Sequence, residues 1–198
     1  MRHIVLTGFM ATGKTAVGRR LAKRLGFDFL DTDQIIEDRE KLPVSEIFAR
    51  RGESEFRRLE RDVVASLAPQ KPTVIATGGG AFVDEANRAA LRRLGPVICL
   101  ITSLETTLER VGRNDKRPLA AGEGAAERLA RLLEARRPFY RMADVLVETD
   151  GLSVEQAVAR VATAIAPRLR GETARRAASL AGGLDEHATA RAQREEKP

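Results

Sequence analysis

The chain has 198 residues, of which 43% are hydrophobic and 31% are charged, with a formal net charge of +6. This length and composition predict one globular domain, with or without a tail, and exclude a collagen-like or wholly disordered chain. No apolar run approaches the roughly 18 residues of a membrane span, and one cysteine cannot form an internal disulfide. We therefore expect a cytoplasmic protein with no membrane partner.

The positive charge indicates an anionic ligand of some kind. Nucleic acid and small anionic substrates such as nucleotides both attract arginine-rich proteins. Only 4% of the residues are aromatic and there is no tryptophan, so the chain offers little material for stacking nucleic-acid bases. The composition thus favours an α/β protein with small anionic ligands, and we expect no nucleic-acid partner.

Short apolar segments alternate with longer helical patterns along the chain. The predicted strands are 3–7, 27–30, 73–77, 96–101 and 144–148. Continuous apolar strands suit a parallel sheet that is covered on both faces. Lys14–Leu25 has one apolar stripe and ends at a glycine, and Ser153 and Gln156 have the spacing of a capping box ahead of another helix. The pattern predicts a three-layer α/β/α fold built from right-handed βαβ units.

The sequence GFMATGKT at 8–15 matches the phosphate-binding pattern G-x-x-x-x-G-K-[S/T] between a predicted strand and a predicted helix. Glycines let successive N–H groups point at phosphate oxygens, and the helix N-terminus adds positive charge there. Lys14 can reach the β- and γ-phosphates, and the Thr15 hydroxyl can bind Mg²⁺. The residues expected to bind ATP or GTP here are Gly8, Ala11, Thr12, Gly13, Lys14, Thr15 and Ala16.

Two carboxylates follow the second predicted strand, at Asp31 and Asp33. They should lie beside the phosphate loop at the carboxyl edge of the sheet. One could help to hold Mg²⁺ while the other orients a substrate hydroxyl. Alternatively, Thr32 or Asp33 simply caps the next helix. The residues alone leave both interpretations open.

Two further segments can each be interpreted either as part of a binding site or as a purely structural feature. GESEFRRLE at 52–60 is either part of a binding site or a solvated charged helix face. Gly78, Gly79 and Gly80 follow the third predicted strand, where missing Cβ atoms would let a ligand touch the main chain. A flexible turn is the alternative.

The polar, glycine-rich segment 112–124 predicts a mobile loop, with Arg110, Arg113 and Arg117 in or before it and Arg136 beyond it. A loop arginine that closes over the γ-phosphate can neutralise charge in the transition state. Residues 168–198 have scattered apolar residues and carry seven Lys/Arg and five Asp/Glu. We expect them to form a disordered or frayed-helix tail outside a domain of residues 1–167.

Taken together, these motifs resemble the shikimate kinases, relatives of the nucleoside monophosphate kinases. The matching segments, in the order of the family, are GFMATGKT at 8–15, DTD at 31–33, GESEFRRLE at 52–60, ATGGG at 76–80, RPL at 117–119 and RRPFY at 136–140. The resemblance implies a P-loop kinase fold with a five-stranded parallel sheet and a mobile lid near 112–124. It also implies phosphoryl transfer from ATP to the 3-hydroxyl of shikimate, in chorismate and aromatic amino acid synthesis, by a monomer.

The resemblance also implies a role for particular residues. Thr15 and Asp31 would bind Mg²⁺, and Lys14 would contact the β- and γ-phosphates. Asp33 would bind the 3-hydroxyl of shikimate, with a substrate-binding segment near 32–60. The remaining implied contacts are Arg57 and Arg136 with the shikimate carboxylate, the backbone of Gly78, Gly79 and Gly80 with the ring, Arg117 with the transferring phosphate, and Arg110 with the adenine.

The chain departs from the family pattern at two places. Ala11 and Thr12 stand where the phosphate loop usually has glycine followed by alanine or serine, and a Cβ at position 11 is harmless if φ is negative there. After the last predicted strand, TDGLSVEQ lacks the arginine or proline that often borders the adenine. The nearest alternative function is another small-molecule kinase, such as a gluconate kinase. A nucleotide-binding module that contacts nucleic acid is a second alternative.

Overall fold

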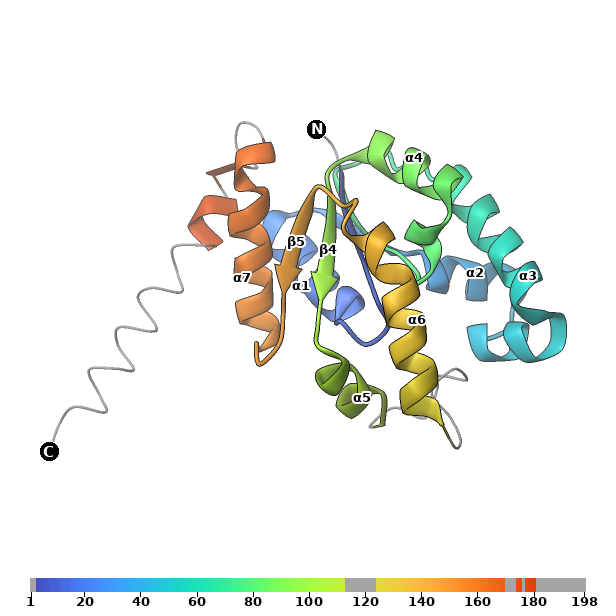
Figure 1. The fold of residues 1–198 in the computed structure, drawn as a ribbon. Helices are drawn as coiled ribbons and strands as arrows, with labels where there is room; N and C mark the ends of the chain where they lie inside the picture. The colour runs from blue at the N-terminus through green and yellow to red at the C-terminus, as the bar shows by residue number, and fades with distance from the viewer. Residues whose placement is uncertain (1–2, 113–123, 170–173, 176, 181–198) are drawn as a thin grey trace, which may run out of the picture.

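The computed structural model describes residues 3–112, 124–169, 174–175 and 177–180 (Figure 1). Five parallel strands form one sheet in the order β2-β3-β1-β4-β5, as the sequence predicts. The strands are β1 (His3–Gly8), β2 (Asp28–Asp31), β3 (Thr73–Ala76), β4 (Val97–Ile101) and β5 (Val145–Glu148). The three-layer α/β/α fold class is therefore confirmed.

Among the described residues, seven helices and two short 3₁₀ turns with defined bounds connect or follow these strands, and residues 174–175 and 177–180 are also helical. The elements with defined bounds are α1 (Lys14–Leu25), α2 (Thr32–Glu40), α3 (Val44–Ala65), η1 (Ala81–Val83), α4 (Glu85–Leu94), α5 (Leu104–Gly112), α6 (Ala125–Tyr140), α7 (Val154–Ile165) and η3 (Ala166–Arg168). Helix α7 begins with the capping box that its sequence predicts, with bonds in both directions between Ser153 and Gln156. Among the described residues, no helix combines the length and the apolar character that crossing a membrane requires.

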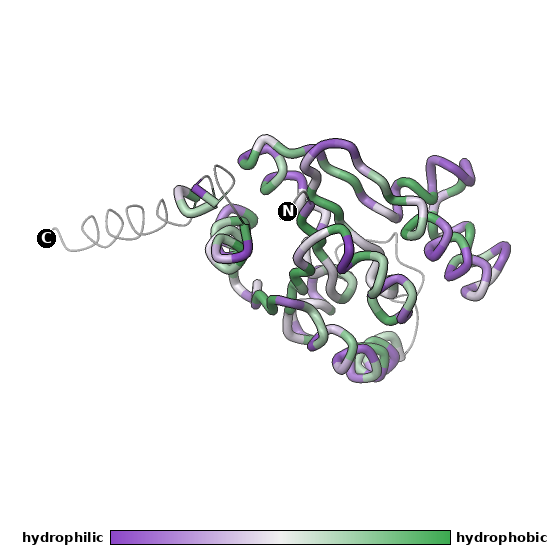
Figure 2. The backbone as a smooth tube through the Cα atoms, turned by 90° about the horizontal axis from the view of Figure 1, so that it is seen from above, coloured by the Kyte–Doolittle hydropathy of each residue, from purple (hydrophilic) through white to green (hydrophobic). Residues whose placement is uncertain are grey.

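Alternate residues of the strands face opposite layers, because successive side chains of a strand point to opposite sides. Ile4 and Leu6 of β1 pack with α1 and α7 on one face, together with Ile98 and Leu100 of β4. Val5 lies on the other face in a cluster with residues of α3, η1 and α4. Figure 2 shows hydrophobic residues in the middle of the molecule, whereas the α2–α3 region on the right is strongly hydrophilic.

The expected domain boundary at residue 167 falls inside one of these clusters. Leu169 and Ala177 are buried in the core that α1 and α7 form, and Ala174 and Leu180 pack against it. Among the described residues beyond 167, two leucines and two alanines therefore pack on the domain. They are scattered along the sequence, so they form no continuous apolar pattern there.

The carboxyl ends of β1, β2 and β3 bring the predicted motifs to one edge of the sheet. Parallel pairing places the end of β1 beside the end of β3, and the end of β3 beside that of β2. The phosphate loop follows β1, Asp31 ends β2, and the three glycines follow β3 within two residues. This edge is where open α/β sheets bind their ligands.

Helix α3 is bent, and the bend directs its second half toward this edge. Gly52 has φ 80° and ψ 172°, which are not helical values. A side chain would be strained at this φ, so glycine suits the bend. Beyond Gly52, the helix carries Arg57 and Glu60 on the side that faces the three glycines.

Candidate active site

The phosphate loop leads from β1 into the N-terminus of α1. Gly13 is the residue before the helix, with φ 90°, and no acidic residue lies in the first turn of α1. The positive end of the helix is thus not neutralised by a local carboxylate. Thr12 is buried, and its hydroxyl donates to the Phe9 carbonyl at 2.9 Å, so this side chain closes the loop.

Ala11 adopts a left-handed conformation with φ 60°. The negative φ at which a Cβ would be harmless here is therefore not adopted. A Cβ in this region comes too close to the following carbonyl oxygen, at a cost of about 1–2 kcal/mol for an ordinary residue. The loop keeps the curvature that a glycine would adopt freely, and the alanine carries the strain.

We expect Ala11→Gly to stabilise the protein by about 1 kcal/mol, which corresponds to a rise in Tm of about 2–4 °C for a chain of this size. The strain at positive φ should outweigh the greater chain entropy that glycine has in the unfolded state. Thermal unfolding followed by circular dichroism measures the change. Ala49→Gly on the exposed surface of α3 is the matched control and should lower stability by about 0.5–1 kcal/mol. A similar loss in both variants would contradict strain at Ala11.

Lys14 lies against the carbonyl groups of the phosphate loop. Its Nζ donates to Gly8 O at 3.0 Å and to Phe9 O at 2.8 Å, and the residue is only 9% exposed. Burial and two backbone bonds hold the ammonium group over the centre of the loop. A compact positive charge in this place suits the β- and γ-phosphates of a nucleotide.

Asp31 joins the phosphate loop to α2. Its Oδ2 accepts from the Thr15 hydroxyl at 2.7 Å, while its Oδ1 accepts from the Asp33 N–H at 3.1 Å and caps the helix. The helix cap expected at Thr32 or Asp33 is therefore Asp31. Because one oxygen serves as the cap, the other stays oriented toward Thr15.

Thr32 is fully buried and holds the first of the three glycines. Its hydroxyl oxygen accepts from the Gly78 N–H at 3.0 Å. A Cβ on Gly78 would lie 2.5 Å from Asp33 Oδ1 and 2.6 Å from Glu60 Oε1, and a Cβ on Gly80 would lie 2.4 Å from Arg57 Nη1. Gly78 and Gly80 therefore cannot carry a Cβ, because charged side chains of α2 and α3 approach the main chain closely at these positions. The alternative interpretation, a flexible turn, does not account for this close packing.

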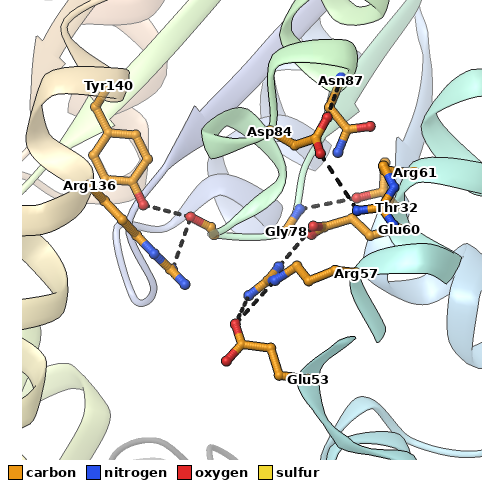
Figure 3. Close-up of polar contacts among 11 residues, drawn as sticks. Thr32, Glu53, Arg57, Glu60, Arg61, Gly78, Asp84, Asn87, Arg136 and Tyr140 are labelled. Carbon is orange, nitrogen blue, oxygen red and sulfur yellow. Dashed lines mark hydrogen bonds and ion pairs between the residues drawn. The ribbon is translucent and has the colours of Figure 1, made fainter. Parts of the chain in front are cut away.

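Arg57 pairs with two carboxylates of its own helix (Figure 3). Its Nη1 donates to Glu60 Oε2 at 2.8 Å, and its Nε and Nη2 donate to Glu53 Oε1 at 3.2 and 3.0 Å. These bonds use three of the five guanidinium N–H groups, which leaves two for a ligand. Burial lowers the pKa of Arg57, but the attraction and hydrogen bonds of Glu60 and then Glu53 outweigh it and raise the pKa above its ordinary value.

Glu60 is 1% exposed, and its Oε1 has no hydrogen-bond partner among the described residues. Burial raises the pKa of this carboxyl, while the Arg57 guanidinium acts in the opposite direction. A buried carboxylate costs much free energy unless it is paired. Glu60 and Arg57 therefore stabilise each other in a fixed geometry.

Arg58, the neighbour of Arg57, points to solvent. It pairs with Glu55 and Asp62, and 53% of its side chain is exposed, compared with 22% for Arg57. The solvated charged face that the sequence suggests thus exists, but it is the Arg58 side of the helix. The Arg57 side faces the glycines.

Arg136 and Tyr140 lie one turn apart on α6 and meet the same carbonyl group. Arg136 Nη1 donates to Gly79 O at 3.3 Å, and the Tyr140 hydroxyl donates to it at 2.6 Å (Figure 3). Both side chains are buried. Burial raises the pKa of Tyr140 well above its usual value, so the hydroxyl stays a donor.

Two adjoining pockets meet at the glycine segment. One, of about 290 Å³, is lined by the phosphate loop and its neighbours: Ala11, Gly13, Lys14, Thr15, Ala16, Asp31, Asp33, Thr77, Gly79 and Arg110. The other, of about 240 Å³, is lined by Glu53, Arg57, Glu60, Arg61, Gly80, Val83, Asp84 and Arg136. Asp33 of the first pocket and Glu60 of the second both approach Gly78 from the side where a Cβ would stand.

Most of the predicted site residues that the structure describes line one of these two pockets. Arg110 bridges the loop and the end of β5, because its guanidinium donates to Ala11 O at 3.2 Å and to Thr149 O at 3.4 Å. Gly8 and Thr12 line neither pocket, so they shape the loop from behind. Arg117, Arg113 and the lid residues 113–123 lie outside the described residues.

Several residues at the site have no ligand role in the sequence interpretation, among them Arg61, Asp84, Thr32 and Tyr140. Arg61 and Asp84 line the second pocket, with 3.6 Å between Arg61 Nη1 and Asp84 Oδ2. The sequence suggests Thr32 only as a helix cap, and it assigns no role to Tyr140. Tyr140 had a detectable signal, since it is the one tyrosine of the chain and follows Arg136 by four residues. Arg61 and Asp84 come from separate elements, and nothing in their sequence spacing links them.

Comparison with known proteins finds a matching family and similar relatives. The family model described as shikimate kinase matches residues 10–166. The shikimate kinase of Moorella thermoacetica is 49% identical over 149 residues, which cover 75% of this chain and 86% of the relative. That of Geobacter sulfurreducens is 45% identical over 162 residues, covering 82% and 90%.

Solved structures with a similar fold include a member of the same family. A shikimate kinase from Acinetobacter baumannii in complex with shikimate superposes with a TM-score of 0.79 at 37% identity, covering 86% of this chain and 96% of that one. A gluconokinase from Sinorhizobium meliloti superposes with a TM-score of 0.53 at 18% identity. The second likeness shows a shared fold alone.

Proposed function

The chain belongs to the shikimate kinase family, and on this premise we propose that its two pockets hold ATP and shikimate for phosphoryl transfer to the 3-hydroxyl. The protein is an ATP-dependent kinase of shikimate. The observation that carries the proposal is the contact between the pockets. Asp33 lines the phosphate-loop pocket and Glu60 lines the second pocket, and the two carboxylates approach the same side of Gly78.

In this proposal the first pocket binds the nucleotide phosphates. The N-terminus of α1 and the loop N–H groups attract them, and Lys14 contacts the β- and γ-phosphates. Lys14 would then exchange its bonds to Gly8 O and Phe9 O for phosphate oxygens. Arg110, whose guanidinium donates to the loop and to Thr149 O, is proposed to contact the adenine. Arg117 is proposed to contact the transferring phosphate.

Thr15 and Asp31 are proposed to hold Mg²⁺. Their oxygens are 2.7 Å apart in the phosphate-loop pocket, and oxygen ligands suit this hard cation. The described residues contain no group of three or more His, Cys, Asp or Glu that could hold a metal. Few protein ligands are typical of Mg²⁺, which keeps waters and substrate phosphates in its shell. When bound, the ion would neutralise charge on the β- and γ-phosphates.

The second pocket suits a small carboxylic acid with hydroxyl groups. Arg57 keeps two N–H groups for a carboxylate, and Arg136 lies on the opposite wall. A guanidinium fork and a planar carboxylate form two charge-assisted bonds. The backbone of Gly78, Gly79 and Gly80 would approach the ring between them. A gluconate kinase reaction remains the alternative, but the paired arginines favour the acid that the family phosphorylates.

Catalysis is proposed to rest on positioning and electrostatics. Asp33 would accept the hydrogen bond of the 3-hydroxyl and orient it toward the γ-phosphate held by Lys14. Phosphoryl transfer needs little covalent chemistry from the protein once the reactants are in line. A coupled assay of ADP release with shikimate, gluconate and quinate tests the choice of substrate. Shikimate should give the highest kcat/KM, and a preference for gluconate would contradict the proposal.

The two carboxylates should have separable roles. We expect Asp33→Asn to collapse kcat while the KM for ATP changes little, because Asp33 contacts the acceptor hydroxyl. Asp31→Asn should shift the Mg²⁺ dependence to higher concentrations. Asparagine also caps helices well, so this variant should keep α2 intact and isolate the effect on the metal. Metal titrations of turnover measure both. Superimposable titrations for Asp31→Asn and the unsubstituted enzyme would contradict the assignment.

A further inference from the structure

The glycine segment between the pockets has little rigidity of its own. Glycine loses more conformational freedom on folding than any other residue, and three stand in a row here. The segment is held from outside and by its own turn. Thr32 accepts from Gly78 N–H, Ala81 N–H donates to Gly78 O, and Val83 N–H donates to Gly80 O. These bonds fix both ends of the segment.

The middle of the segment depends on α6. The Gly79 carbonyl accepts from Tyr140 at 2.6 Å and from Arg136 at 3.3 Å. The shorter bond is the stronger of the two, because hydroxyl donors bond carbonyls best near 2.7–2.8 Å. None of the bonds that hold the segment uses the N–H groups of Gly79 and Gly80.

A peptide bond couples this carbonyl to the next N–H group. The Gly79 C=O and the Gly80 N–H belong to one planar trans unit, in which the two groups point in opposite directions. Donors on the carbonyl therefore set the direction of the Gly80 N–H, which must point away from Tyr140. Gly80 lines the second pocket, and Figure 3 places Arg57 on the opposite side of the segment from Tyr140.

We infer that Tyr140 is a positioning residue that fixes the Gly79–Gly80 peptide so that the Gly80 N–H faces the bound acid. The inference rests on the function proposed above. Arg136 cannot replace it, because Arg136 is the partner of the substrate carboxylate. Tyr140 keeps the carbonyl occupied when Arg136 turns to the ligand. Its ring is held in one buried cluster with Phe9, Met10 and Cys99, beneath the start of the phosphate loop.

The test is Tyr140→Phe in the full chain, which removes the hydroxyl and keeps the ring. The KM for shikimate and its dissociation constant, measured by calorimetry without ATP, should rise about tenfold, as for a loss of about 1.4 kcal/mol. The KM for ATP and kcat at saturating shikimate should stay within about twofold, which a general loss of structure would not produce. Thr163→Val, which removes a hydroxyl that donates to Ala159 O at 3.0 Å in α7, is the control and should leave all constants unchanged.

Two results would overturn the inference. An unchanged KM for shikimate in Tyr140→Phe would show that the peptide is held without the hydroxyl. Equal increases of both KM values would show a loss of structure instead of positioning. If the unsubstituted enzyme did not phosphorylate shikimate at all, the proposed function would fail as well. Normal turnover of the unsubstituted enzyme with either of the first two results removes the inference alone.

Discussion

Lys14→Ala is expected to abolish measurable turnover, a loss of at least about a thousandfold in kcat, while the fold stays intact. The ammonium group is the point charge that the β- and γ-phosphates meet as negative charge moves during transfer. Its stem contributes little to the apolar core, since its described bonds are to carbonyls of the loop. Single-turnover kinetics and thermal unfolding of the same preparation measure the two effects.

Lys23→Ala is the matched control for this prediction. Lys23 lies in the last turn of the same helix, exposed to solvent and away from both pockets. It should retain the activity of the unsubstituted enzyme. Near-normal turnover in Lys14→Ala, or similar losses in both variants, would contradict the role of Lys14.

Arg57→Ala is expected to raise the KM for shikimate by at least about 30-fold, with little change in the KM for ATP. Losing one partner of a desolvated charge pair costs roughly 2–5 kcal/mol, which corresponds to about a 30- to several-thousand-fold loss in affinity. The substitution also leaves the buried Glu60 without its guanidinium, so some loss of stability should accompany it. Arg57→Lys should not restore the KM, because an ammonium group cannot form the forked pair.

The neighbouring arginine provides an internal control. Adjacent helical residues point about 100° apart, so Arg58 meets Glu55 and Asp62 at the surface. Exposed pairs contribute little, and Arg58→Ala should change either KM by less than about threefold. Measuring both KM values for both variants decides the matter. Equal damage from the two substitutions would make this helix a solvated charged face after all.

Much of the fold could be predicted because its signals are local. The phosphate-loop motif indicates a strand before it and a helix after it, and continuous apolar strands indicate a buried parallel sheet. All five predicted strands occur in the structure within one or two residues of their expected bounds. The pairing of Arg57 with Glu60 also follows from a spacing of three residues on a helix.

Other features depend on contacts that no local pattern contains. The positive φ of Ala11 is set by the closure of the loop, in which Thr12 bonds Phe9, and not by the preference of alanine. Asp31 caps α2 because β2 ends at that residue. The tight fit of Gly78 and Gly80 against Asp33, Glu60 and Arg57 joins three separate elements. Each of these features is set by tertiary packing and not by the local sequence.

The most direct measurement identifies the product of the reaction. ATP and shikimate are incubated with the full chain, ADP is quantified, and the product is assigned by correlating phosphorus with ring protons in NMR. One equivalent of ADP should form for each phosphorylated acid, with the phosphorus coupled to the proton at carbon 3. Release of ADP without a phosphorylated acid, or phosphate on another hydroxyl, would contradict phosphoryl transfer between the two pockets.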